Sequence, residues 1–93
     1  MATIKSDSFE FIEGNSAKFY TIELVEDAEA GFSVLATFGR IGAAKPQMVV
    51  KELVAGKLQT KSDTSAGFAD AAAAEPTYQA CVAERLKKGY VRR

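Results

Sequence analysis

The sequence contains no histidine and no tryptophan, and it has one cysteine and two prolines in 93 residues. Without histidine, the usual general base near neutral pH and the usual activator of a serine or cysteine nucleophile are missing. A single cysteine without histidine excludes the common zinc sites and any internal disulfide bond. A glycine-rich phosphate loop of the type GxxxxGK[ST] is also absent. We therefore expect a non-enzymatic chain with no catalytic residue, no metal and no cofactor.

Long hydrophobic runs are missing as well. The longest strongly apolar run spans residues 31–38, whereas a membrane-spanning helix needs about 20 residues. The first seven residues lack the apolar stretch of a signal peptide, and the lone Cys81 is typical of a reducing compartment. We expect one domain over residues 1–93, without a membrane segment, located in the cytoplasm.

The charge is balanced in total but unevenly distributed. Residues 1–30 hold two basic and seven acidic side chains, and residues 31–93 hold ten basic and five acidic ones. This asymmetry allows a basic face that binds a polyanion, but it is equally compatible with an ordinary mixed surface.

The first two thirds of the chain show the two-residue period of half-buried strands. In one such strand Tyr20, Ile22 and Leu24 share a face, and in the next Val34 and Ala36 do so. Glycines 39 and 42 suggest backbone conformations closed to residues with a Cβ, and residues 55–56 suggest a tight turn. The expected strands are residues 9–12, 18–26, 32–38, 47–54 and 57–61.

The last third changes to a helical period. Tyr78, Val82 and Leu86 recur every four residues, with Cys81 beside them, as on the buried stripe of a helix. Pro76 is expected near the start of this helix, after a separate helical turn around residues 65–73. The sequence thus predicts an α+β fold, an antiparallel sheet of about five strands with one long C-terminal helix packed across one face. The other face would be free to meet a partner.

Three segments in order resemble the WGR domain family. They are residues 18–27 (KFYTIELVED), residues 38–42 (FGRIG) and residues 85–90 (RLKKGY). They follow the family pattern of a K-F-Y-x-(I/L)-x-L strand, an acidic hairpin, an aromatic strand ending in W-G-R-(I/V)-G, and a closing helix ending in K-x-x-G-(Y/W). The resemblance is strongest over residues 17–91. It implies an α+β fold and nucleic-acid binding, as in poly(ADP-ribose) polymerases, but no polymerase activity, because no length remains for a catalytic domain.

The resemblance also implies roles for single residues. Phe38-Gly39-Arg40 stands where the family has Trp-Gly-Arg. Arg40 then holds a phosphate at a DNA break, because guanidinium forms paired hydrogen bonds with phosphate oxygens; the alternative is an arginine that bonds backbone carbonyls and holds the sheet together. Phe38 either stacks on a terminal base or sugar or belongs to the core. Arg85, Lys87 and Lys88 match the basic helix end of the family, and dipole compensation explains them equally well.

Further lysines, Lys45, Lys51 and Lys57, lie in the basic part of the chain and are candidates for phosphate contacts, or for solvated strand edges. The predicted partner is nucleic acid, DNA rather than RNA, with ends or nicks as the favoured substrates. The alternative is a protein-interaction module that docks another protein through the open sheet face or edge. The expected oligomeric state is a monomer or a weak homodimer.

Overall fold

The computed structural model describes residues 2–28, 31–42, 44–60 and 67–92, and these form an α+β structure of an antiparallel sheet and one helix. The elements are β1 (Ala2–Glu13), β2 (Ser16–Asp27), β3 (Gly31–Arg40), β4 (Gln47–Val54), β5 (Lys57–Thr60), α1 (Ala71–Lys87) and β6 (Val91–Arg92).

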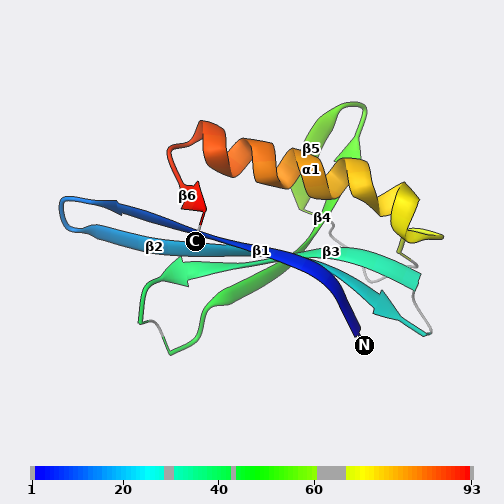
Figure 1. Ribbon diagram of the computed structural model, residues 1–93, viewed down its shortest axis with the longest axis horizontal. Coiled ribbons are helices and arrows are strands. Elements are labelled where there is room, and N and C mark those ends of the chain that lie inside the picture. The colour runs from blue at the N-terminus through cyan, green and yellow to red at the C-terminus, as the bar shows by residue number, and fades with distance from the viewer. Residues whose placement is uncertain (1, 29–30, 43, 61–66, 93) are drawn as a thin grey trace.

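The sheet has the order β5-β4-β3-β2-β1-β6, so consecutive strands of the first five are neighbours. Helix α1 lies across one face, and the β4–β5 hairpin rises beside it (Figure 1). The β1–β2 hairpin extends beyond the C-terminal end of the helix, where the tip of the sheet is left uncovered (Figure 1). No helix among the described residues is long and apolar enough to cross a membrane.

The core lies between α1 and the sheet face that the two-residue period predicted. The strand residues Ile22, Leu24, Val34 and Ala36 are all buried, as is Phe9 on the adjoining strand. The helix contributes a buried stripe to this core: Ala74, Thr77, Tyr78, Cys81 and Val82. Burial of these apolar side chains is the main force that holds the helix against the sheet.

The sheet has six strands rather than about five. Strand β1 is longer than the expected residues 9–12, because it pairs with β2 along almost its whole length, with a bulge between Thr3 and Lys5. The additional strand β6 pairs with β1 through Phe9↔Arg92 and Glu10↔Val91. Neither feature leaves a strong local pattern, since the start of β1 is exposed and β6 is only two residues long.

Pro76 does not mark the start of the helix, which begins at Ala71 and continues through the proline. The Asp70 side chain caps the N-terminus by accepting a hydrogen bond of 2.7 Å from the backbone N–H of Ala73. The separate helical turn expected around residues 65–73 is wrong in its described part, because residues 71–73 already belong to α1. Phe68 forms a β-bridge with Phe32 instead, and residues 65–66 lie outside the described residues. Tertiary packing of the helix outweighs the backbone hydrogen bond lost at Pro76.

The buried stripe also ends differently from the prediction. Leu86 is 48% exposed, and Arg85 takes the position that continues the stripe after Cys81 and Val82. Beyond it the helix closes in a Schellman motif: the Gly89 N–H donates to the Leu86 carbonyl and the Tyr90 N–H donates to the Arg85 carbonyl. Gly89 has φ +94°, which glycine adopts without strain. The glycine of the closing K-x-x-G-(Y/W) pattern therefore ends the helix.

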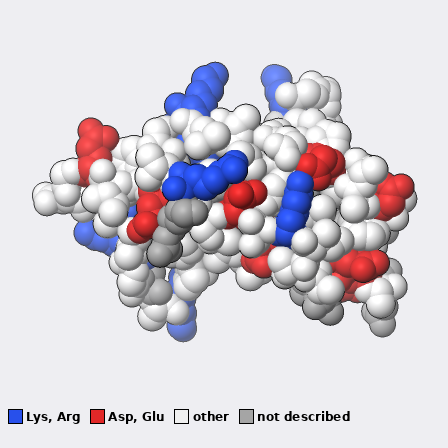
Figure 2. Space-filling model, viewed as in Figure 1, with Lys and Arg blue, Asp and Glu red and all other residues white. Residues whose placement is uncertain are grey.

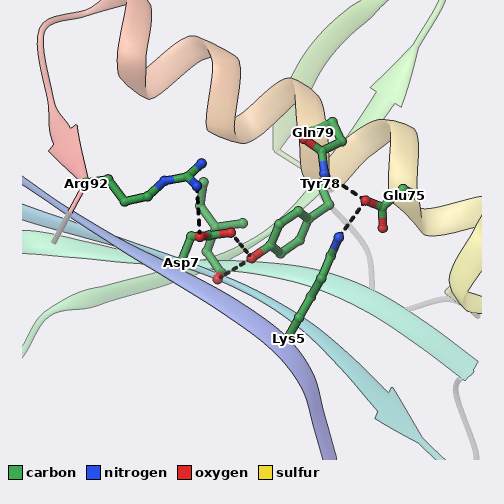
Figure 3. Close-up of polar contacts among 7 residues, drawn as sticks. Lys5, Asp7, Glu75, Tyr78, Gln79 and Arg92 are labelled. Atoms are coloured by element: carbon green, nitrogen blue, oxygen red, sulfur yellow. Dashed lines mark hydrogen bonds and ion pairs between the residues drawn. The ribbon is translucent and has the colours of Figure 1, made fainter.

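A polar network fixes the middle of the helix to β1 and β6 (Figure 3). The Tyr78 hydroxyl donates a hydrogen bond of 2.6 Å to Asp7 Oδ2, and Arg92 lies 3.8 Å from the other oxygen of this carboxylate. On the same side, Lys5 forms an ion pair with Glu75. Burial, followed by the bond to the Asp7 carboxylate, raises the pKa of Tyr78 far above its usual range, so the hydroxyl remains a donor.

Candidate functional site

A cavity of about 480 Å³ lies at the uncovered tip of the sheet, next to the C-terminal end of α1. It forms where β3 ends and the β1–β2 hairpin continues: the Ile41 N–H still donates to the Ala17 carbonyl, and the chain then turns away. Its lining residues come from the hairpin, from the end of β3 and from the segment after the helix: Asn15, Ser16, Ala17, Lys18, Phe19, Phe38, Gly39, Arg40 and Tyr90.

Phe38 supplies an aromatic wall of this cavity and also packs on the core. Its ring stacks on Tyr20, with a centroid distance of 5.5 Å and an interplanar angle of 13°. The two residues are cross-strand partners on β3 and β2, which explains the parallel rings. Phe38 is half-buried, so one part of the ring packs on the core while another lines the cavity. The two roles considered for Phe38 are therefore compatible.

Arg85 organises the aromatic side chains behind the cavity. Its guanidinium carbon lies 4.3 Å from the Tyr20 ring centroid and 5.1 Å from the Tyr90 ring centroid. Burial raises the pKa of Tyr20 to about 12, and the positive charge of Arg85 opposes part of this rise. A cation held between two rings gains from their quadrupoles and restricts their motion. Arg85 thus positions Tyr90 at the cavity.

Arg40 is exposed at the end of β3, directly across from Lys18 on β2. Within the described part of the chain, neither side chain takes part in an ion pair with a carboxylate. Two positive groups on paired strands form a suitable site for an anion. Arg40 is exposed at the end of the sheet rather than buried within it, and its role as a phosphate ligand stays a prediction.

Gly39, between Phe38 and Arg40 on β3, has an ordinary backbone. A Cβ placed there would lie 3.6 Å from Pro46 Cα and 3.7 Å from a ring carbon of Phe19, which are normal contacts. Of the two glycines that suggested special conformations, only Gly42 has a positive φ, +88°. The prediction was therefore wrong for Gly39. Its missing side chain keeps the space beside Phe19 open.

A second cavity, of about 400 Å³, adjoins the first. It is lined by Phe11, Lys18, Arg85, Lys88 and Tyr90, and it shares Lys18 and Tyr90 with its neighbour. The Lys18 ammonium lies 5.9 Å from the Phe11 ring centroid, and the rings of Phe11 and Tyr90 are 5.4 Å apart. The two cavities therefore form one continuous surface of aromatic rings and cations.

The structure gathers some of the residues predicted from the sequence and leaves others apart. Phe38, Gly39 and Arg40 line the first cavity, and Arg85 and Lys88 line the second. The remaining predicted lysines line neither. Lys45 is exposed in the loop between β3 and β4, and Lys87 is exposed on the helix. Lys51 lies on β4, where it donates a hydrogen bond of 3.4 Å to the Thr60 hydroxyl. It lines a separate cavity of about 190 Å³.

Sequence reasoning missed Phe11, Lys18 and Tyr90 as site residues. Lys18 begins the strand segment of residues 18–27, and Tyr90 ends the segment of residues 85–90, but neither was named as a site residue. The alternation of the strand could have indicated Lys18, because it places Lys18 and Tyr20 on the same face of β2. The pairing Lys18↔Arg40 required the register between two strands, and a single sequence does not state that register.

The described residues contain no group of three or more cysteine or acidic side chains arranged to hold a metal ion. The surface charge is mixed in the view of Figure 2, where basic and acidic side chains are interspersed. On the open sheet face the strand register places Glu10 and Glu23, on the face opposite Tyr20 and Phe38. The acidic and basic halves of the sequence therefore do not form two separate faces: Lys18 lies beside Arg40 in the strand pair, and Glu84 pairs with Arg85 on the helix.

Comparison with known proteins gives one match. The family model described as the WGR domain matches residues 7–93, nearly the whole chain. Neither the curated proteins nor the solved structures contain a match.

Proposed function

Because the chain belongs to the WGR domain family, whose members are generally nucleic-acid-binding modules, we propose that it is a non-catalytic module that binds DNA at the cavity between Arg40, Lys18 and Phe38. The supporting observation is the position of Arg40: its side chain is exposed, faces Lys18 across the strand pair and stands at the mouth of a cavity with an aromatic wall. Cations bind phosphate oxygens, and an aromatic face stacks on a base or sugar.

Strand ends and nicks fit this cavity better than the middle of an intact duplex. An unpaired or terminal nucleotide exposes a base or sugar face for stacking, whereas internal base pairs are already stacked on their neighbours. The stacking partner here is the ring of Phe38, which is held flat against Tyr20. Phenylalanine in place of tryptophan keeps the aromatic face and loses the indole N–H donor. Because the net charge is zero, we expect modest affinity with a strong dependence on salt.

The test is fluorescence anisotropy with a blunt, 5′-phosphorylated duplex at low salt, comparing the wild type with Arg40→Gln. Lys57→Gln is the matched control, because Lys57 is exposed on β5, lines neither cavity and loses the same charge. Loss of one phosphate contact decreases the slope of log K against log salt by about 0.9. We expect this decrease for Arg40→Gln and not for Lys57→Gln. Equal binding by all three proteins would refute the proposal.

Substrate preference is tested in the same assay. A duplex whose ends are closed by hairpin loops removes free ends, and an RNA duplex of the same sequence replaces the sugar. The proposal predicts that the open DNA duplex binds more tightly than the closed one. Equal affinity for the open and closed DNA would exclude recognition of ends and leave only backbone binding.

One observation favours a second function, docking of another protein. The open sheet face carries apolar side chains at the surface, among them Met48, which is 62% exposed, and Val54, which is 46% exposed. Exposed apolar groups on an uncovered face are common in protein interaction sites. A pull-down that recovers a partner despite nuclease and high salt, and that Met48→Glu abolishes while Arg40→Gln does not, would support this function.

A further inference from the structure

The Glu84 carboxylate pairs with two of the cations that line the second cavity, Arg85 and Lys88. One of its oxygens, Oε1, accepts a hydrogen bond of 2.6 Å from Arg85 Nη2 and lies 4.0 Å from Lys88 Nζ. A single carboxylate oxygen thus faces two of the three cations that line this cavity. The third cation, Lys18, contacts the Phe11 ring and has no carboxylate partner in the described part of the chain.

Arg85 is fixed in place but incompletely hydrogen-bonded. Only 11% of its side chain is exposed, and its guanidinium lies between Tyr20 and Tyr90. Its Nε is buried and has no hydrogen-bond partner among the described residues. A buried donor without an acceptor is unfavourable, so the group gains more than an exposed arginine would from a new acceptor. Because the two rings restrict it, little conformational entropy is lost when an anion binds.

Phosphate is the anion that fits these donors. A phosphate group has several oxygens that can accept hydrogen bonds from one guanidinium and from nearby ammonium groups. In the free protein, by contrast, the single oxygen Glu84 Oε1 pairs with both Arg85 and Lys88. The C-terminal end of helix α1 repels anions, and the positive charges of these two residues offset that effect. Glu84 itself has 35% of its side chain exposed, so it can move into water when a competing anion arrives.

We propose that the second cavity is a phosphate subsite whose cations Arg85 and Lys88 are paired with Glu84 in the free protein, and that a backbone phosphate of bound nucleic acid displaces this carboxylate from them. The inference rests on the proposed function for the source of the phosphate. The first cavity shares Lys18 and Tyr90 with the second. A strand that leaves Arg40 along this continuous surface therefore reaches Arg85 next. Glu84 acts as an internal competitor that lowers the affinity.

The first measurement compares Glu84→Gln with Glu52→Gln in the anisotropy assay. Both changes remove one negative charge, but Glu52 lies on β4, where its carboxylate accepts a hydrogen bond from Gln59, and it lines neither cavity. We expect Glu84→Gln to bind duplex at least about fivefold more tightly than Glu52→Gln, because the phosphate no longer has to displace a carboxylate from Arg85 and Lys88. Affinities of the two variants within twofold of each other would overturn the proposal.

The second measurement follows the Arg85 Nε–H signal in a proton–nitrogen NMR spectrum while inorganic phosphate, and separately the duplex, is added. A buried Nε–H exchanges slowly with water and gives an observable signal. We expect a downfield shift with either ligand, larger in Glu84→Gln than in the wild type. A signal that does not move with either ligand would overturn the subsite.

The two measurements separate the subsite from the proposed function. If phosphate shifts the Arg85 signal but duplex binds neither protein, the subsite stands and DNA binding fails. If duplex binds through Arg40 while Glu84→Gln behaves like Glu52→Gln and the Arg85 signal stays in place, DNA binding stands and the subsite fails.

Discussion

Replacing Tyr78 by phenylalanine tests whether the polar network in Figure 3 stabilises the fold. Tyr78 is 1% exposed, and its hydroxyl donates a hydrogen bond of 2.6 Å to Asp7 Oδ2. A hydrogen bond to a charged group contributes about 1.5–3 kcal/mol. The Asp7 side chain is 26% exposed, so water replaces part of the lost bond. We therefore expect the lower end of this range, a loss of about 1.5 kcal/mol in the free energy of unfolding.

The assay is urea unfolding together with thermal unfolding. For a domain of this size, 1 kcal/mol shifts Tm by about 4–8 °C, so Tyr78→Phe is expected to lower Tm by about 6–12 °C. Tyr90→Phe is the matched control, because within the described residues the Tyr90 hydroxyl makes no hydrogen bond. We expect it to change stability by less than about 0.5 kcal/mol.

A double-mutant cycle with Asp7→Asn isolates the bond itself. Asp7→Asn also weakens the contact with Arg92, which lies 3.8 Å from the carboxylate, but this loss occurs with and without Tyr78→Phe and cancels in the cycle. We expect a coupling energy of about 1 kcal/mol between the two changes. The reasoning is refuted if the two losses simply add, or if Tyr78→Phe is no more harmful than Tyr90→Phe.

Three further changes test the buried core, the turn between β4 and β5, and the close approach of Gly31 to Phe68. Burial raises the pKa of Cys81 to about 11 and the pKa of Tyr20 to about 12. Because both groups ionise first in the unfolded chain, stability is full only below about pH 8. We expect urea unfolding to show a loss on the order of 3 kcal/mol between pH 8 and pH 11, and a smaller loss in Cys81→Ala. No change over this range would contradict the burial of both groups. Ala55 has φ +52° in the tight turn between β4 and β5, so Ala55→Gly should raise the free energy of unfolding by about 1 kcal/mol, and a destabilised variant would show that the turn has another conformation. Gly31→Ala places a Cβ 2.6 Å from the Phe68 carbonyl oxygen, whereas Gly14→Ala meets open space at a similarly positive φ. Gly31→Ala should therefore lose clearly more stability than Gly14→Ala, and equal losses would argue against the close approach at Gly31.

The alternation of apolar residues predicts which side chains face the core on each central strand. The two-residue alternation placed Ile22, Leu24, Val34 and Ala36 on one face, and all four are buried. This works because alternation is a local property of an extended chain. The turn at residues 55–56 is equally local, and it was predicted correctly.

The side chains that meet at the candidate site are set by long-range packing, which local patterns do not show. Arg85 rather than Leu86 continues the buried stripe, because the direction in which α1 crosses the sheet sets which side of its last turn meets Tyr20. Lys18 faces Arg40 because of the register of β2 on β3. Lys87, close in sequence to Arg85, lines neither cavity. Local patterns determine the face on which a side chain lies, but long-range packing determines which side chains lie next to it. A binding site is made of side chains that are adjacent in space, so its composition depends on that packing.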